Sequence, residues 1–332
     1  MPGPDVVTAV AYPNIALVKY WGKRDERLVL PCADSLSMTL DVFPTTTHVQ
    51  LTPHAQDIVI VDGVTAQGEM ARRITSFLDL VRKRARSKRC ARVETRNTVP
   101  VGAGLASSAS GFAALALAAA TAYGLPTEPK ELSRLARRGS GSAARSVFGG
   151  FVIWHAGSPD APDPDRSSYA EPLTSACTDL ALVAVLVDTG PKPIPSREAM
   201  RRTVATSPLF PDWLMQTRHD MTVMRRALAQ GDITTVGEIA ERNALGMHET
   251  MAGAVPPVRY LTPASHRVLE EVCRLRDQGV GAWATVDAGP NIKVLCSGGD
   301  AEQVAVRLRE LSRRPAVVAR SGPGAALYGT QR

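Results

Sequence analysis

The chain has 332 residues, of which 44% are hydrophobic and 21% charged, and its Lys and Arg residues exceed its Asp and Glu residues to give a net charge of +7. This composition argues against a disordered or membrane-embedded chain and is typical of one large or two smaller globular domains. The five cysteines form no CxxC motif or Cys/His cluster, which argues against a zinc site or a disulfide framework and suits a reducing compartment.

The N-terminal segment lacks the basic start and the apolar core of a signal peptide. The apolar run at 112–120 is too short and too soon interrupted to span a bilayer. We therefore expect a cytoplasmic protein in which this run is a buried helix.

Hydrophobic periodicity predicts a mixture of strands and helices in chain order. Strands are expected at 6–18, 47–62, 146–154 and 179–189 and in "AWATVD" and "IKVLC", and helices at 69–86, 104–123, 130–138, 197–206, 212–230, 233–251, 264–278 and 300–313. A proline- and aspartate-rich surface loop is expected at 156–172. The order indicates an α+β fold in two parts, 1–190 and 191–332, joined by a linker near 190–195.

The densest basic run, "RKRARSKRCAR" at 82–92, has two interpretations. It is a patch for nucleic acid or the polar end of an amphipathic helix. The helix is favoured, because Ile74, Phe77, Leu78 and Val81 recur at helical spacing and no aromatic residues interleave with the run. The overall positive charge also suits a small polyanionic substrate.

The segment "VPVGAGLASSASG" places glycines and serines directly before a predicted helix. Such a loop lets backbone N–H groups approach an oxyanion, and the helix N-terminus adds partial positive charge. It is not a Walker A loop, because no lysine follows the glycine. A tight turn with serine caps explains the same residues, and composition alone leaves both interpretations open.

Four further motifs contain residues that could act on a substrate, and each also has a structural explanation. Asp287 ends a predicted strand before "AGPN", where an aspartate most often binds its own turn. "KYWGKRD" holds Lys19 and Lys23, two of only seven lysines, which are either point charges for an anion or surface residues beside a core Trp. In "GSGSAARS" and "PSREAM", the serines and arginines form anion sites or helix caps.

These motifs together resemble the diphosphomevalonate decarboxylases of the GHMP kinase superfamily. The resemblance rests on "AYPNIALVKYWGKRD", "GLASSAS", "RLARRGSGSAARSVFGGF", "IPSREAM", "NALGMHETM" and "TVDAGPN", which occur in order along nearly the whole chain. It implies the GHMP fold, with a ribosomal protein S5 domain 2-like ATP-binding part at 1–190 and an α+β C-terminal part at 191–332. It further implies ATP- and Mg²⁺-dependent decarboxylation of (R)-5-diphosphomevalonate to isopentenyl diphosphate, ADP, phosphate and CO₂.

The resemblance also assigns roles to individual residues. Asp287 would take or orient the proton of the C3 hydroxyl, Lys23 would contact that aspartate and the substrate, and Arg145 would hold the substrate carboxylate. The residues expected to bind ATP are Val101, Gly102, Ala103, Gly104, Leu105, Ala106, Ser107 and Ser108, with Ser107 orienting the γ-phosphate and weakly assisting Mg²⁺. Those expected to bind the substrate are Asn14, Tyr20, Trp21, Lys23, Ser140, Ser142, Arg145, Ser196, Arg197 and Met200. His248 is interpreted as structural.

The chain departs from the family pattern at two places. Val101 replaces a threonine, and Ala33 and Asp34 stand where an asparagine is common, so part of the nucleotide pocket is expected to differ. The family implies a cytoplasmic homodimer whose partners are small molecules rather than nucleic acid or membrane. Alternative functions are decarboxylation of a related 3-hydroxy acid such as the monophosphate, a small-molecule kinase of the same fold, and nucleic-acid binding through 82–92.

Overall fold

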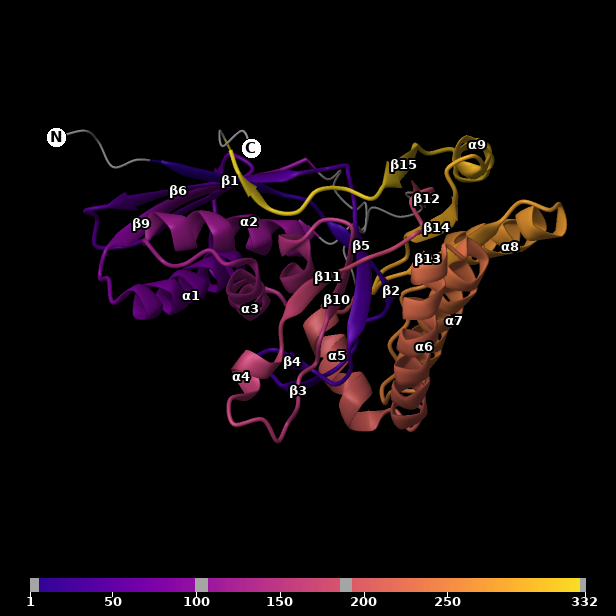
Figure 1. Ribbon diagram of the computed structural model, residues 1–332, viewed down its shortest axis with the longest axis horizontal. Coiled ribbons are helices and arrows are strands. Elements are labelled where there is room, and N and C mark those ends of the chain that lie inside the picture. The colour runs from indigo at the N-terminus through magenta and orange to yellow at the C-terminus, as the bar shows by residue number, and fades with distance from the viewer. Residues whose placement is uncertain (1–5, 99–106, 186–192, 329–332) are drawn as a thin grey trace.

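The computed structural model describes residues 6–98, 107–185 and 193–328, and of Ser107 only the backbone. Figure 1 shows two parts side by side, a sheet covered by helices on the left and a helix-rich part on the right. The helices are α1 (Gly68–Ala85), α2 (Ser107–Ala122), α3 (Pro129–Gly139), the 3₁₀ helix η1 (Gly141–Val147), α4 (Pro164–Ser167), α5 (Ser196–Thr206), α6 (Phe210–Gln230), α7 (Ile233–Ala252), α8 (Pro263–Asp277) and α9 (Ala301–Ser312).

The strands form three larger sheets and one hairpin, β3 (Lys23–Asp25) with β4 (Leu30–Pro31). The six-stranded sheet has the order β16 (Ala326–Leu327), β1 (Val7–Ala11), β6 (Thr45–Thr52), β9 (Cys90–Asn97), β7 (Ile58–Val61), β8 (Val64–Thr65). A four-stranded sheet has the order β11 (Ala170–Leu173), β10 (Phe151–Trp154), β5 (Ser35–Thr39), β2 (Asn14–Val18). The other has the order β13 (Ala282–Val286), β14 (Ile292–Ser297), β12 (Leu180–Val185), β15 (Ala316–Arg320).

Helix α2 forms the centre of the N-terminal part. Alanine and leucine occupy nearly every position from Ala113 to Ala120, and all of these residues are buried. Small side chains let the helix approach β1 and β6 on one face and α1 and α3 on the other. The apolar run is therefore the buried helix that the sequence predicts.

Helix α7 joins the two parts of the molecule. It packs against α6, against β2 of the central sheet and against β13 of the C-terminal sheet (Figure 1). Because β2 is an edge strand, its free side faces α7 and the strand β13 rather than another strand of its own sheet. The residues that follow β2 and β13 are thereby brought together.

The two predicted halves of the sequence do not correspond to separate sheets. Strand β12 pairs with β14 and β15 of the C-terminal sheet, whereas β16, near the end of the chain, pairs with β1 of the N-terminal sheet. The predicted boundary at residue 190 falls in 186–192, outside the described residues, and it stays a prediction.

The basic segment 82–92 divides between two elements. Helix α1 buries Ile74, Phe77, Leu78 and Val81 and ends at Ala85, which confirms the amphipathic helix. From Cys90 the chain forms β9, a strand that the sequence analysis missed because arginines alternate with its inward residues Ala91 and Val93.

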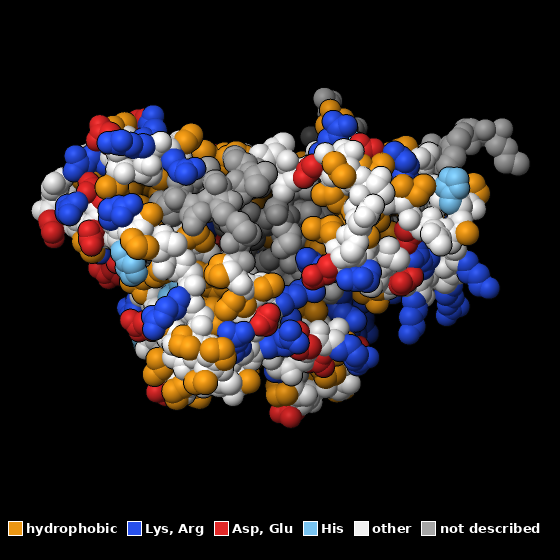
Figure 2. Space-filling model, turned by 180° about the vertical axis from the view of Figure 1, so that it is seen from behind, with side chains coloured by type: hydrophobic (Ala, Val, Ile, Leu, Met, Phe, Trp, Pro, Cys, Tyr) orange, Lys and Arg blue, Asp and Glu red, His pale blue; other side chains and the backbone are white. Residues whose placement is uncertain are grey.

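Several arginines of this segment are paired with carboxylates. Arg82 donates two hydrogen bonds to Asp57, at 2.8 and 3.0 Å, and Arg84 lies 3.6 Å from Asp165. Figure 2 shows Lys and Arg side chains spread over both parts of the visible face, with acidic side chains among them. On this face the mixture of charges is typical of a solvated surface.

Other differences from the predicted elements follow from glycine, proline and serine. The expected strands 6–18 and 47–62 are each two strands, the first divided at Tyr12 and Pro13. The expected strand 146–154 begins only at Phe151, because Gly141–Val147 forms the 3₁₀ helix η1. The expected loop 156–172 contains the short helix α4 and ends in strand β11.

Candidate active site

The glycine–serine segment meets a helix N-terminus, as predicted. Val101, Gly102, Ala103, Gly104, Leu105 and Ala106 lie outside the described residues, as does the side chain of Ser107. Helix α2 begins at Ser107, and the Ser108 hydroxyl lies 3.3 Å from the Ser140 hydroxyl. The structure therefore places the motif "GSGSAARS" (139–146), the second serine motif, against the first turn of α2, where helix N–H groups favour an anion.

Close packing at Gly141 fixes the path of the second serine motif. A Cβ atom there would lie 2.9 Å from both the Trp154 ring and the Tyr20 hydroxyl. Tyr20 in turn packs edge-on against Trp154, with ring centroids 4.7 Å apart. The Tyr20 hydroxyl is buried and has no hydrogen-bond partner within the described part of the chain, so it is a donor that a ligand could satisfy.

Arg145 of η1 is a buried guanidinium held by neutral groups. Its side chain donates to Asn14 at 3.3 Å, to Ser37 at 2.9 Å and to Ser35 at 2.5 Å. Asn14 is itself fixed, since its amide donates to the Ser142 carbonyl at 3.0 Å and to the Ser146 hydroxyl at 2.7 Å.

The environment of Arg145 leaves part of its guanidinium available. Burial lowers the pKa of Arg145 to about 10, and the charge of Asp287 partly opposes this. Arg145 forms no ion pair with a described carboxylate, and its Nη2 has no hydrogen-bond partner among residues 6–98, 107–185 and 193–328. A buried cation without an anionic partner is suited to an anionic ligand.

Asp287 follows β13 and lies between two ammonium groups. Lys19, directly after β2, is 2.8 Å from Asp287 Oδ1, and Lys293 of β14 is 3.4 Å from Oδ2. Both lysines are almost fully buried, whereas the Asp287 side chain is 29% exposed. Two cations favour the ionised carboxylate, and its exposure allows a substrate to reach it.

The lysine beside Asp287 is Lys19, so the expected contact of Lys23 with this aspartate is corrected. Lys23 instead lies 2.5 Å from Glu26. The physical reason is Gly22, whose φ of +93° turns the chain into the β3–β4 hairpin and carries Lys23 past the turn. A Cβ atom at Gly22 would also lie 2.7 Å from the Phe210 ring, so this turn requires glycine.

His248 of α7 supports the backbone of Asp287. Its Nε2 donates to the Asp287 carbonyl at 3.1 Å. Burial lowers the pKa of His248 to about 4, so the ring is neutral at physiological pH. The interpretation of His248 as a structural residue agrees with this contact.

Two arginines meet at the end of α3. Arg197 of α5 and Arg73 of α1 both donate to the Gly139 carbonyl, at 3.3 and 3.5 Å. Neither forms an ion pair with a described carboxylate, and the pKa of Arg73 is lowered by burial and by the charge of Arg197. Two like charges beside Ser140 are suited to an anionic ligand, and we refer to Arg73, Arg197 and Ser140 as the candidate anion site. Arg197 was predicted, whereas Arg73 was missed because only the fold brings α1 to this point.

The remaining predicted substrate residues, Trp21, Ser196 and Met200, lie at or against helix α5. Trp21 and Met200 are buried in one apolar cluster with Phe210 and Trp213, as a pocket wall would be, and the buried Trp21 indole N–H has no hydrogen-bond partner within the described part of the chain. Ser196 begins α5 and hydrogen-bonds with Tyr260, whose hydroxyl donates to the Ile194 carbonyl at 2.8 Å. At the departure from the family pattern, Asp34 accepts from the Ala156 N–H at 2.7 Å.

The described residues contain no group of three or more His, Cys, Asp or Glu side chains that could hold a metal ion. The Asp287 carboxylate already forms ion pairs with Lys19 and Lys293. Mg²⁺ takes oxygen ligands, and the phosphates of ATP would supply them. The expected contribution of Ser107 falls on a side chain outside the described residues.

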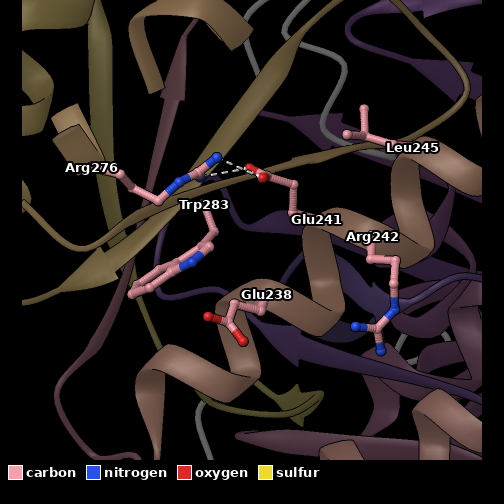
Figure 3. A pocket seen from close by; sticks show the side chains of 6 residues that line it. All are labelled: Glu238, Glu241, Arg242, Leu245, Arg276 and Trp283. Atoms are coloured by element: carbon pink, nitrogen blue, oxygen red, sulfur yellow. Dashed lines mark hydrogen bonds and ion pairs between the residues drawn. The ribbon is translucent and has the colours of Figure 1, made fainter. Parts of the chain in front are cut away.

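A cavity of about 240 Å³ is lined by residues of α7, α8 and β13 rather than by these residues (Figure 3). It is lined by Glu238, Glu241, Arg242, Leu245, Arg276 and Trp283. None of the predicted site residues contributes to it. The candidate active site is instead the set of residues that interact electrostatically around Tyr20: Asp287 acts on Arg145, and Arg145 and Arg197 both act on Tyr20.

Comparisons with known proteins show the family to which the chain is similar. Residues 11–170 match the family model "Diphosphomevalonate decarboxylase-like N-terminal domain", and residues 181–320 match "Mevalonate 5-diphosphate decarboxylase C-terminal domain". The chain is 35% identical over 326 residues to diphosphomevalonate decarboxylase mvd1 of Aspergillus fumigatus, covering 92% of this chain and 80% of the relative.

Solved structures of similar proteins superpose on nearly the whole chain. One is the mevalonate diphosphate decarboxylase from Enterococcus faecalis, from work on the mevalonate diphosphate mediated ATP binding mechanism of that enzyme. It is 42% identical to this chain, has a TM-score of 0.91, and the match covers 98% of this chain and 99% of that one. Another is MDDEF in complex with MVAPP, AMPPCP and magnesium, with 42% identity, a TM-score of 0.92 and the same coverage.

Proposed function

Since the chain belongs to the diphosphomevalonate decarboxylase family, we propose that the residues around Asp287 and Arg145 carry out the reaction of that family. The enzyme uses ATP and Mg²⁺ to convert diphosphomevalonate to isopentenyl diphosphate, ADP, phosphate and CO₂. One observation carries the assignment of residues: Lys19 and Lys293 both pair with Asp287, and the charge of Asp287 also acts on Arg145, which forms no ion pair with a described carboxylate.

The chemistry requires an activated oxygen before the carboxylate can leave. The C3 hydroxyl is a poor leaving group, and ATP supplies the phosphoryl group that makes it a good one. Loss of phosphate leaves positive character at C3, and the carboxylate then departs as CO₂ to form the alkene. The protein therefore needs a group for the hydroxyl proton, a cation for the carboxylate and a basic site for the diphosphate.

Asp287 is the group proposed to act on the C3 hydroxyl. Lys19 and Lys293 hold its carboxylate ionised and in one orientation, and His248 fixes its backbone carbonyl. An ionised, oriented carboxylate accepts the hydroxyl proton as the oxygen attacks the phosphoryl group. Lys19 takes the place that the sequence analysis gave to Lys23 beside this carboxylate.

Arg145 is proposed to hold the substrate carboxylate. Asn14, Ser35 and Ser37 fix the guanidinium on one side and leave Nη2 for the ligand. A fixed carboxylate keeps the breaking C–C bond aligned with the leaving phosphate, and the positive charge discourages loss of CO₂ before that phosphate departs.

The diphosphate is proposed to bind beside hydroxyl groups and arginines that form no ion pair with a described carboxylate. Tyr20, Ser140, Ser142 and Arg197 were predicted to bind the substrate, and Arg73 joins them through the contact with Gly139 that it shares with Arg197. Lys23, whose side chain is only 6% exposed, stays a candidate for contact with the substrate from the β3–β4 hairpin. The segment Val101–Ser108 is proposed to hold the phosphates of ATP at the start of α2.

We also propose the cytoplasmic homodimer that the family resemblance implies. No helix in the described ranges combines the length and the apolar composition needed to cross a membrane. The expected sedimentation mass of the purified enzyme is twice that of the chain, and the mass of a single chain would contradict the dimer.

The function is tested by incubating the purified protein with ATP, Mg²⁺ and carboxyl-labelled diphosphomevalonate and counting CO₂ against ADP. One CO₂ for each ADP is expected. ADP without CO₂ would show a kinase instead, and neither product would show that the site acts on a different acid. The same assay with the monophosphate as substrate tests the choice of diphosphate.

A further inference from the structure

The backbone N–H of Lys19 is held by a side chain from a distant part of the sequence. Strand β2 ends at Val18 and is an edge strand, so no neighbouring strand accepts this N–H. Asn243 of α7 accepts it through Oδ1 at 2.8 Å, in a fully buried contact. The residue that carries the ammonium group beside Asp287 is thereby fixed at its main chain.

The amide of Asn243 can adopt only one orientation here. Its Nδ2 donates to the Thr217 hydroxyl at 3.2 Å and to Asp220 Oδ2 at 2.9 Å, both on α6. Because Asp220 only accepts hydrogen bonds, it holds the nitrogen of the amide toward α6 and the oxygen toward Lys19. A flipped amide would set its oxygen against a carboxylate and its nitrogen against an N–H.

Asp220 is a completely buried carboxylate outside the proposed reaction residues. Its Oδ1 accepts from Gln216 at 2.9 Å and from Arg242 at 2.6 Å. Arg242 pairs with Asp220 and not with the neighbouring Glu241. Figure 3 shows its guanidinium apart from the Glu241–Arg276 pair. Burying a carboxylate is costly, and here its contacts orient one amide.

Lys19 is therefore fixed at two points. Asn243 holds its N–H, while its ammonium group lies 2.8 Å from both the Ala16 carbonyl and Asp287. A shift at the main chain would move the ammonium group relative to Asp287. Misplacement by about 1 Å at a reaction centre costs on the order of 100-fold in rate.

We propose that Asn243 and Asp220 are positioning residues that set the place of Lys19 beside Asp287. The inference rests on the proposed role of Asp287 and adds two buried residues, one on α7 and one on α6. The chain of contacts runs from Arg242 at the outer side of α7, through Asp220 and Asn243, to the end of β2.

The first test is Asn243→Ala, compared with Thr217→Val as a matched control. Both remove a partner from the same buried α6–α7 contact, but only the alanine frees the Lys19 N–H. We expect kcat to fall about 30- to 100-fold in Asn243→Ala with both KM values within about 3-fold, and kcat to change less than about 3-fold in Thr217→Val. Thermal unfolding and ATP titration identify the folded fraction of each variant.

Equal losses of kcat in the two variants, or a loss in KM alone for Asn243→Ala, would overturn the proposal, since either would indicate a general packing role.

The second test exchanges the two groups and remains decisive if the alanine variant does not fold. Asn243→Asp alone places two carboxylates in contact and is expected to lose activity at least as strongly as Asn243→Ala. Adding Asp220→Asn restores one amide and one carboxylate, and leaves an acceptor for the Lys19 N–H. The double variant should recover kcat by about 10-fold or more over Asn243→Asp. A folded double variant without recovery would overturn the proposal.

These outcomes are separable from those that concern the proposed function. A wild-type enzyme that releases no CO₂ from diphosphomevalonate contradicts the function itself. A wild-type enzyme that is active, together with an Asn243→Ala variant of unchanged kcat, contradicts only the positioning role.

Discussion

The proposed reaction centre and the proposed anion site of this protein are built differently. The reaction centre, Asp287 with Lys19 and Lys293, is a set of charges already paired, and buried residues of α7 hold its main chain. The anion site, Arg73 and Arg197 beside Ser140, brings two like charges together at one carbonyl, and neither arginine forms an ion pair with a described carboxylate.

The difference follows from what each region contributes. A carboxylate that must accept a proton at one moment of the reaction gains from an orientation fixed in advance. A site for a polyanion gains from cations that only the ligand neutralises. Changes in the reaction centre should therefore lower kcat, and changes in the anion site should raise KM.

The largest effect is expected for Asp287→Asn. The amide keeps the size of the side chain but cannot accept the hydroxyl proton, so kcat should fall about 1,000-fold or more while ATP still binds. Steady-state kinetics and nucleotide titration measure the two quantities. Asp277→Asn, at an exposed position of α8, is the control, and activity of Asp287→Asn within 10-fold of wild type would remove Asp287 from its role.

Arg145→Lys should have the next largest effect. A lysine carries all its donors on one atom, so it cannot keep the contacts to Asn14, Ser35 and Ser37 and also reach a carboxylate. CO₂ release should fall about 100-fold, and more ADP than CO₂ should form. Arg166→Lys, on the exposed side of α4, serves as control. Unchanged kinetics for Arg145→Lys would mean that the carboxylate binds elsewhere.

Arg73→Gln tests the anion site. Removing one of the two guanidinium groups should raise KM for diphosphomevalonate about 10-fold and change kcat less than about 3-fold. The neighbouring Arg72 is exposed on the same helix, so Arg72→Gln is a matched control that should leave KM unchanged. A fall in kcat alone for Arg73→Gln would contradict the division between the two regions.

The smallest effect concerns stability at acid pH. The pKa of His248 is lowered from 6.5 to about 4 by burial, so below pH 6.5 the unfolded chain binds a proton that the folded chain does not. Folding stability should therefore decrease as the pH falls from 6.5 to 4, by roughly 3 kcal/mol from this residue. Thermal unfolding between these pH values should show a weaker decrease for His248→Gln than for wild type or for the exposed control His219→Gln; equal decreases would contradict the assignment.

Much of the fold could be predicted from periodicity, and the failures have physical causes. The helices α1 and α2 were predicted because an apolar face and an apolar run are local signals. Strand β9 was missed because its outward arginines, solvated in the folded protein, look like the end of a helix in the sequence.

The candidate site could be predicted in its residue types but not in all its contacts. Lys19 and Lys23 share one motif and one chemistry, and only the turn at Gly22 separates their directions. Arg73, Lys293 and Asn243 lie on a helix, a strand and another helix far apart in the sequence. No local signal reports that folding brings them to Arg197, Asp287 and Lys19.

The most direct test of the central claim, that Lys19 and Asp287 form a reaction centre assembled before the substrate binds, is a single-turnover measurement on Lys19→Met with both substrates saturating. ADP and CO₂ formation should both slow by about 100-fold or more while the affinity for ATP stays within about 3-fold of wild type. A wild-type rate of ADP formation, or a defect that saturating substrate abolishes, would contradict the claim.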